Sequence, residues 1–328
     1  MYTKKRYDLW TTIKWSKKPL IFGLFYSFAI TLFHAITQID IALPYQPISI
    51  IGISTAFYLG FKNNSSYDRS WEARKIWGGI VNSSRSFASG LIAFVQGPGA
   101  NEIVKEMIYR HIAWMTALRY QLRLKRDWEN DEVRIKGVFS PEVTEKYITD
   151  LGAELTPYIS KEEFEYIDGK TNIAAQLLSI QVKRLQDIRN QNYYEDYRHM
   201  ELFNIVKSLI DEQGKSERIK NFPFPRQYAS VAYWVTVVFS ILLPFSMLDI
   251  LMKEKPLAIW LNIPVSGLII WIFFLMEKIG NASENPFEGG YNDVPITTIS
   301  RSIEIDIREM IDDVNIPSQI KAEQGFLL

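Results

Sequence analysis

The chain has 328 residues, and its 37 Lys and Arg residues are balanced by 37 Asp and Glu residues. A zero net charge argues against a nucleic-acid-binding protein, which normally carries a basic excess. Because the chain contains no cysteine, disulfide bridges, thiolate metal sites and cysteine nucleophiles are all excluded.

The first apolar run covers residues 21–36 and contains no charged residue. With some tilt it approaches the length that a helix needs to cross a bilayer. No small-residue cleavage site follows it, so we expect a retained membrane helix and not a signal peptide. Six basic residues precede this run: Lys4, Lys5, Arg6, Lys14, Lys17 and Lys18.

The second apolar run, residues 48–61, is short and carries Ser, Thr and Gly. Helices of small, weakly polar residues pack against other helices or line a cavity more readily than they face lipid. Residues on this run recur at roughly helical intervals: Gln46, Ile50, Ser54 and Phe61, and likewise Ile53 and Phe57. The stripe is either a contact between helices or one wall of a pore shared by several subunits, which apolar rings close by dewetting.

Residues 62–227 are densely charged and have apolar residues at helical spacing, for example Ile76, Ile80 and Phe87. This pattern predicts a domain of amphipathic helices. We expect helix breaks near Gly97-Pro98-Gly99 and across residues 139–156.

Two further apolar runs, residues 228–252 and 257–276, predict a third and a fourth membrane span. The polar tail contains one amphipathic stretch, residues 299–314, that we expect to be helical. The predicted protein is therefore an all-α membrane protein with four transmembrane helices and a large helical domain. Its parts are residues 1–61 with spans one and two, the domain 62–227, spans three and four in 228–280, and the C-terminal segment 281–328.

Basic residues in the flanks predict the orientation, because they favour the cytoplasmic side. The six basic residues before the first span place the N-terminus and the helical domain in the cytoplasm, and four spans return the C-terminus to the same side. Lys253 and Lys255, in the turn between spans three and four, weakly oppose this assignment. We expect a multi-pass protein of the inner cell membrane.

No enzyme chemistry is visible in the sequence. His34, His111 and His199 are far apart and have no metal-binding spacing, and neither a P-loop nor a nucleophile elbow is present. Acidic pairs such as Asp312-Asp313 are typical of solvated helix faces. We therefore expect no catalytic site, no metal and no cofactor.

Two sequence segments, the second span with the residues that follow it and the stretch after the fourth span, together resemble the bestrophin family of ion channels, and its bacterial branch in particular. The resemblance covers nearly the whole chain and includes the four-span layout with a long insert between spans two and three. The matching residues are Pro47-Ile48-Ser49, Phe61-Lys62-Asn63-Asn64, the run Ser66-Tyr67-Asp68-Arg69 with Glu72 and Arg74, and Asn285-Pro286-Phe287 after span four.

The resemblance implies a homopentamer with one central pore, whose membrane neck is lined by span two. Alignment with the family places three neck rings at Gln46, Ile50 and Ser54, of which only Ile50 keeps the apolar type. A small rotation of the helix would put Ile53 and Phe57 there in their place. A second, cytosolic aperture is expected close to Met200, Leu202 and Phe203.

The resemblance also bears on gating and selectivity. Animal bestrophins follow Asn-Pro-Phe with an acidic cluster that binds calcium, whereas only Glu288 and Asp293 stand in the corresponding stretch here. Two carboxylates are too few for a calcium site unless other oxygens contribute, so we expect no calcium gating. A helix that begins at Pro47 and points at the pore favours anions. The family mostly conducts chloride, so the resemblance implies chloride as the ion, and sodium selectivity, as in some bacterial members, is the alternative.

Two other classes of function remain open at this stage. A transporter would place ionisable groups inside the membrane, usually within inverted repeats, whereas these spans are nearly free of charge and show no repeat. A membrane-anchored scaffold would use aromatic-rich helices such as residues 71–77 to bind a partner protein. The partners we expect are further copies of the same chain, the lipid bilayer and permeant monovalent ions.

Overall fold

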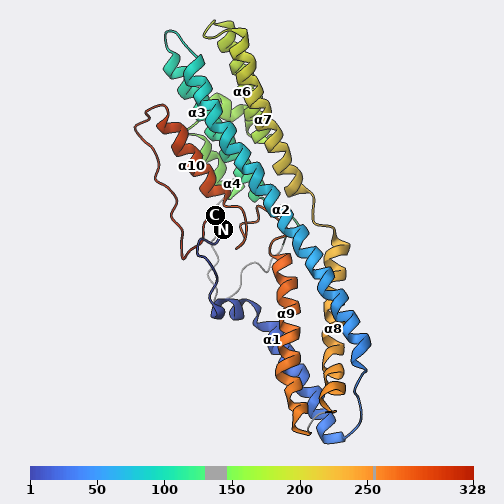
Figure 1. The fold of residues 1–328 in the computed structure, drawn as a ribbon. Coiled ribbons are helices and arrows are strands. Elements are labelled where there is room, and N and C mark those ends of the chain that lie inside the picture. The colour runs from blue at the N-terminus through green and yellow to red at the C-terminus, as the bar shows by residue number, and fades with distance from the viewer. Residues whose placement is uncertain (130–145, 254–255) are drawn as a thin grey trace.

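The computed structural model describes residues 1–129, 146–253 and 256–328. Part of the predicted break across 139–156 therefore lies outside the described residues, and within the described part the prediction is wrong, because residues 147–155 are helical. Regular structure in these ranges is helical, apart from isolated bridges near the two termini. The molecule is elongated, and one end holds the apolar helices while the other holds the helical domain (Figure 1). The elements are α1 (Leu9–Thr37), α2 (Tyr45–Phe94), α3 (Ala100–Arg123), α4 (Tyr147–Leu155), α5 (Lys161–Ile167), α6 (Ile173–Asn190), α7 (Asp196–Asn221), α8 (Arg226–Leu251), a 3₁₀ helix (Pro256–Leu261), α9 (Asn262–Asn281) and α10 (Ile296–Glu309).

Three helical segments are long and apolar enough to cross a membrane: Leu9–Thr37, Arg226–Leu251 and Leu257–Asn281. They contain the first, third and fourth predicted spans. The second predicted span is not among the segments that this measure finds in the described ranges, because its apolar run is short and charged residues follow from Lys62 onward.

The second span is the beginning of a much longer helix. Helix α2 has 50 residues and continues without interruption past residue 61, from the apolar bundle into the helical domain (Figure 1). At 1.5 Å per residue its length is about 75 Å. It ends just before Gly97-Pro98-Gly99, where both glycines have a positive φ that other residues disfavour, so the predicted break is confirmed.

Close backbone contacts hold the apolar helices together. Helices α1 and α9 lie side by side (Figure 1), and Gly23 faces Gly267 where they meet. A Cβ atom at Gly267 would lie 2.6 Å from Leu24 Cδ2 and 3.2 Å from Leu24 N, so a larger residue requires the Leu24 side chain or α1 to move. Small residues at such positions allow helices in lipid to approach closely. Helix α2 packs in the same way on α8, where Gly52 meets the ring of Phe239.

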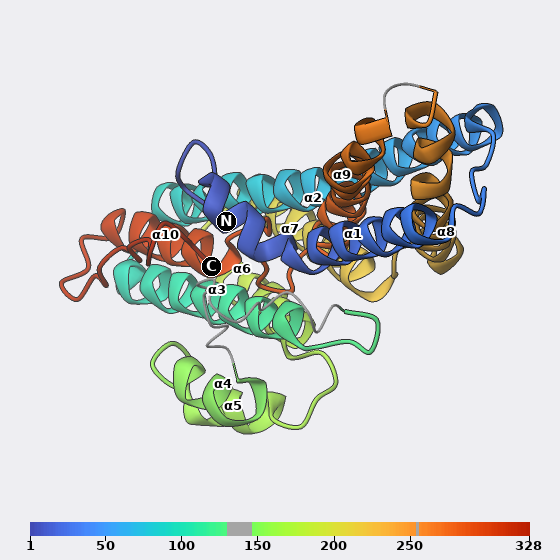
Figure 2. The same ribbon diagram turned by 90° about the horizontal axis from the view of Figure 1, so that it is seen from below.

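The helical domain has its core between the second half of α2 and helices α3, α6 and α7. The predicted apolar stripe Ile76, Ile80 and Phe87 is buried there, together with Trp77 and Trp114. Helices α4 and α5 pack on the outside of this layer (Figure 2), and α10 covers α2 and α3. Helix α10 covers residues 299–309 of the predicted amphipathic stretch 299–314, which confirms that expectation for most of its length.

The two ends of the chain meet beside the helical domain (Figure 1). The amide of Thr3 donates to Gly325 O at 2.8 Å, and the amide of Leu327 donates to Met1 O at 2.8 Å. The rings of Tyr2 and Phe326 lie 4.9 Å apart. The C-terminal tail is therefore folded back onto the N-terminal segment of its own chain.

Candidate functional site

The five predicted neck residues share one exposed face at the start of α2. Ile50, Ile53 and Phe57 are 64%, 58% and 67% exposed, and Gln46 and Ser54 lie beside them. The opposite face, with Ile48, Gly52, Thr55 and Leu59, is buried. A single chain thus leaves an apolar strip of α2 uncovered. This part of α2 lies beside α8 at the apolar end of the molecule (Figure 1).

Hydroxyl groups on this strip are occupied by the helix itself. Ser54 Oγ donates to Ile50 O at 2.9 Å, and Ser49 Oγ donates to Gln46 O at 2.8 Å. A serine bonded to the carbonyl of the preceding turn has no hydroxyl proton left to offer an ion. The strip is therefore less polar than the residue types at Ser49 and Ser54 indicate.

Helix α2 begins at Tyr45, two residues earlier than the predicted start at Pro47, which lies within the first turn. Proline is tolerated there because the first turn has no intrahelical acceptor for its N–H. The amide of Tyr45 donates to Asp249 Oδ2 at 3.2 Å, and Asp249 also pairs with Lys253 at 3.0 Å. A carboxylate from α8 thus already lies at the positive end of this helix.

The next motif residue, Lys62, ties α2 to the end of α9. Its side chain is fully buried, lies 3.2 Å from Glu277 Oε1 and also donates to Asn281 Oδ1. Asn63 packs against Gly280, where a Cβ atom would collide with the amide oxygen of Asn63. These residues act as an anchor between two helices and do not face the exposed strip.

Arg69 fixes α2 to two chain segments at once. Its guanidinium donates to Glu284 O at 2.8 Å and to Phe222 O at 2.8 Å. Glu72 extends this contact through an ion pair of 2.7 Å with Arg218. Four other motif residues are instead exposed on α2: Asn64, Tyr67, Asp68 and Arg74.

The Asn285-Pro286-Phe287 motif forms a loop that is closed around one carboxylate. Asp293 accepts the amides of Phe287 at 2.7 Å, Gly289 at 2.6 Å and Val294 at 2.6 Å. Arg123 Nη1 donates to Asp293 Oδ2 at 3.0 Å and to Phe287 O at 3.1 Å. Phe287 has a positive φ of 75° and is fully buried, so this loop has one specific conformation.

The three predicted aperture residues differ in their surroundings. Met200 is 52% exposed on α7 and Phe203 is half-buried, whereas Leu202 is fully buried in the core, where it faces Gly90 of α2. Met200 is thus the residue of the three that is free to reach a surface of the subunit.

A comparison with protein families decides the identity of the chain. Residues 12–309 match the family model described as bacterial/fungal bestrophin protein. The chain belongs to the bestrophin family. It is therefore a membrane protein, in agreement with its three long apolar helices.

Named relatives of this bestrophin are found in several bacteria. The voltage-dependent anion channel-forming protein YneE of Escherichia coli K12 is 26% identical over 315 residues, with 96% of this chain and 92% of YneE covered. The protein RSc3414 of Ralstonia nicotianae, described in the same words, is 26% identical over 290 residues, with 88% and 84% covered. The crystal structure of a bacterial bestrophin homologue from Klebsiella pneumoniae has the same fold, with a TM-score of 0.76, 22% identity, and 90% of this chain and 98% of that chain covered.

Several residues that organise this bestrophin were not singled out from the sequence. Glu277 and Asn281 follow span four, where a charged pair ordinarily marks the edge of the membrane. Arg123 lies in a densely charged stretch, and no local pattern distinguishes it from its exposed neighbours. Asp293 was noted as one of two carboxylates near Asn-Pro-Phe, but its contact with Arg123 spans 170 positions in the chain.

Proposed function

We propose that this bestrophin is an anion channel in which several copies of the chain surround one central pore. The observation that carries this proposal is the uncovered apolar strip of α2, with Ile50, Ile53 and Phe57. Such a strip suits the wall of a narrow neck, which apolar rings can close by dewetting. The names of the curated relatives, which are anion channel-forming proteins, support the choice of ion.

The proposed assembly is a homopentamer in the inner membrane, and the start of α2, from residue 45 to about residue 61, supplies the second of four crossings. Its packing on α8 and α9 supports this placement. Both termini and the helical domain then lie in the cytoplasm, where the second half of α2 and Met200 extend the conduit. Native mass spectrometry should give five copies of the 38.1 kDa chain.

Calcium gating is not expected, because the loop after α9 does not fit a calcium ion. The carboxylate of Asp293 already accepts three amides, and Arg123 brings a fixed positive charge to it and to Phe287 O. A calcium ion needs six to eight oxygens that are free to ligate. Currents should therefore be the same with cytosolic calcium added or chelated, and steep activation by calcium would contradict this assignment.

Sodium conduction is the second candidate, and the position of Asp249 favours it. This carboxylate lies at the N-terminus of α2, where it opposes the attraction of the helix for anions. The exposed Asp68 lies further along α2. Recording in asymmetric salt separates the candidates, because the sign of the reversal potential gives the sign of the permeant ion.

The decisive experiment is recording from the purified chain in planar bilayers, with a matched pair of variants. Ile50→Ala shortens a side chain on the exposed strip and should raise the unitary current if this strip lines the neck. Ile48→Ala removes the same atoms from the buried face and should leave the current unchanged. An unaltered current in Ile50→Ala would refute the register, and a folded oligomer without current would favour a scaffold or a transporter.

A further inference from the structure

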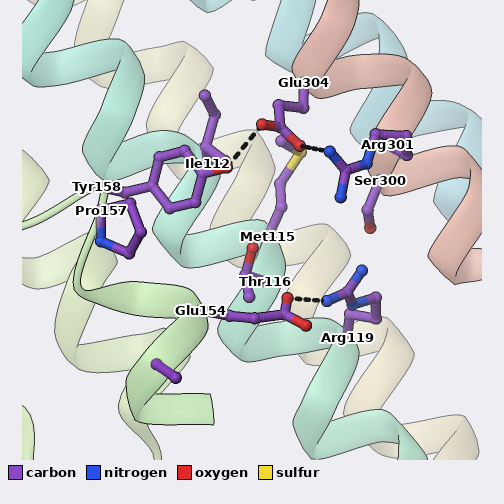
Figure 3. Close-up of a pocket in the computed structure, with 11 residues that line it drawn as sticks. Ile112, Met115, Thr116, Arg119, Glu154, Pro157, Tyr158, Ser300, Arg301 and Glu304 are labelled. Carbon is purple, nitrogen blue, oxygen red and sulfur yellow. Dashed lines mark hydrogen bonds and ion pairs between the residues drawn. The ribbon is translucent and has the colours of Figure 1, made fainter. Parts of the chain in front are cut away.

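A cavity of ≈ 300 Å³ lies in the helical domain between α3, the end of α4 and α10. Side chains from all three elements converge on it (Figure 3), among them Arg119, Glu154, Tyr158 and Arg301. This volume is at the lower end of the range for small-molecule sites. The cavity is remote from the exposed strip of α2, and the proposed channel function gives it no role.

The carboxylate of Glu154 is paired with α3 on one side of the cavity. One oxygen accepts from Arg119, and the other accepts the hydroxyl of Tyr120 at 2.7 Å. Both oxygens are thus committed to partners on α3. Glu154 therefore brings no uncompensated negative charge to the cavity.

Glu304 is engaged in the same way on the opposite side, on α10. Its Oε1 accepts the hydroxyl of Tyr158 at 2.6 Å and Arg308 Nη1 at 3.0 Å, and its Oε2 lies 3.3 Å from Arg301 Nη1 (Figure 3). These contacts place two guanidinium groups on Glu304, of which Arg308 also pairs with Asp313 at 2.8 Å. Neither carboxylate that lines the cavity therefore presents an unsatisfied negative charge.

The remaining hydrogen-bonding capacity belongs to donors. Ser300 is 6% exposed and lines the cavity, and its hydroxyl has no hydrogen-bond partner among the residues that the structure describes. In the same part of the chain, Arg301 Nε is buried without a partner. A guanidinium has five N–H donors and no acceptor, so Arg301 keeps donors available beyond its contact with Glu304. Buried polar groups left in this condition cost free energy unless a ligand or water satisfies them.

We infer that this cavity binds a small anion with carboxylate or phosphate oxygens, held by Arg301 and Ser300 on α10. Guanidinium groups form charge-assisted hydrogen bonds with these oxygens, and their planar fork matches both chemistries. The bound anion touches α10 and also the end of α4, so it links two elements that both pack on α3. Occupancy therefore stabilises the helical domain against unfolding.

The test uses the full-length chain in detergent, with sodium phosphate and sodium succinate titrated at constant ionic strength against chloride. Isothermal titration calorimetry measures binding, and far-ultraviolet circular dichroism measures the thermal midpoint. We expect saturable binding of at least one of the two anions and a higher midpoint. Binding of phosphate alone or succinate alone supports the site and selects the ligand class.

Two variants locate the site. Arg301→Gln should weaken binding about tenfold, because it removes a charge-assisted contact. Ser300→Ala, which is the milder change, should weaken it about threefold through loss of one hydrogen bond. Arg189→Gln is the matched control, because Arg189 forms an exposed pair with Asp196 and does not line the cavity.

Two results would overturn the inference. The first is the absence of saturable binding by phosphate and by succinate to the folded wild-type chain. The second is binding that Ser300→Ala and Arg301→Gln leave as strong as in the Arg189→Gln control. If Arg301→Gln does not fold, the Ser300→Ala result alone decides between the two outcomes.

Discussion

Lys62 is a fully buried charge at the point where α2 leaves the apolar bundle. Its ammonium group is stabilised by Glu277 and by Asn281, and each member of this group needs the others. Removing one partner of a buried pair leaves a charge without compensation, which costs far more than the pair itself contributes.

Lys62→Met should therefore lower the free energy of unfolding by about 3–5 kcal/mol. The double variant Lys62→Met/Glu277→Gln should recover part of this loss, because no charge remains unpaired. Thermal unfolding in detergent measures both effects.

Glu72→Gln breaks the exposed pair with Arg218 and serves as control, with an expected loss of about 0–1 kcal/mol. Equal losses in Lys62→Met and in the control would show that Lys62 is hydrated.

His111 makes the stability of the helical domain depend on pH. Burial lowers the pKa of His111 to about 3, while its Nε2 lies 2.9 Å from Ser84 Oγ. The unfolded chain has a His pKa of about 6.5, so between these values the unfolded state binds the extra proton. His111 therefore does not reduce the free energy of unfolding above about pH 6.5. As the pH falls from there toward about 3, protonation of His111 in the unfolded chain lowers that free energy.

At about pH 5 the loss attributable to His111 is about 2 kcal/mol. His111→Gln cannot take up the proton, so its thermal midpoint should fall less than that of the wild type between pH 7.5 and pH 5. The difference between the two slopes isolates His111 from the carboxylates that also titrate. Parallel slopes would mean that the buried imidazole is not neutral.

At the scale of elements, the contact between α1 and α9 depends on Gly23 and Gly267. Gly267→Val should push α1 away from α9 and lower the thermal midpoint, because a Cβ atom there would collide with Leu24. Gly60→Ala is the matched control on α2, where a Cβ atom meets nothing within 4 Å. The control should be neutral or stabilising by up to about 1 kcal/mol. A Gly267→Val protein as stable as the control would refute the close contact.

The sequence alone predicted the elements that have a clear local signal. Uncharged runs of more than fifteen residues predicted α1, α8 and α9, and the Gly-Pro-Gly turn predicted the end of α2. The continuity of α2 was not predictable in the same way, because its composition changes sharply at Lys62 while its backbone does not. Periodicity found the exposed strip at Ile50, but only tertiary contacts reveal that Lys62, Arg69 and Asp293 hold the structure around it.

At the scale of the whole molecule, the two ends of the structure differ, and chemical labelling can determine which side of the membrane each end faces. The loop at residues 38–44 joins α1 to α2 at the far end of the apolar bundle, and the helical domain lies at the other end (Figure 1). Because the natural sequence contains no cysteine, single introduced thiols report on one position each.

In the proposed orientation, a membrane-impermeant maleimide should label Asp40→Cys from outside the inner membrane. Tyr197→Cys, on the helical domain, should react only after the membrane is permeabilised, although Tyr197 is 87% exposed. Mass spectrometry of the labelled chain measures both reactions. The reverse pattern would place the helical domain outside the cell membrane and would invert the assignment drawn from the basic residues near the N-terminus.

The unbroken helix α2 also restricts where residues can be inserted into or deleted from such a chain. One inserted residue turns everything beyond it by about 100° and advances it by about 1.5 Å. An insertion at residue 61 would therefore keep Ile50 on its strip while it turned Arg69 away from the carbonyls of Glu284 and Phe222. Insertions of seven residues, close to two full turns, would restore the direction of Arg69 but not its height. Length changes in this family should consequently accumulate in the loops that flank α2 and be rare within it.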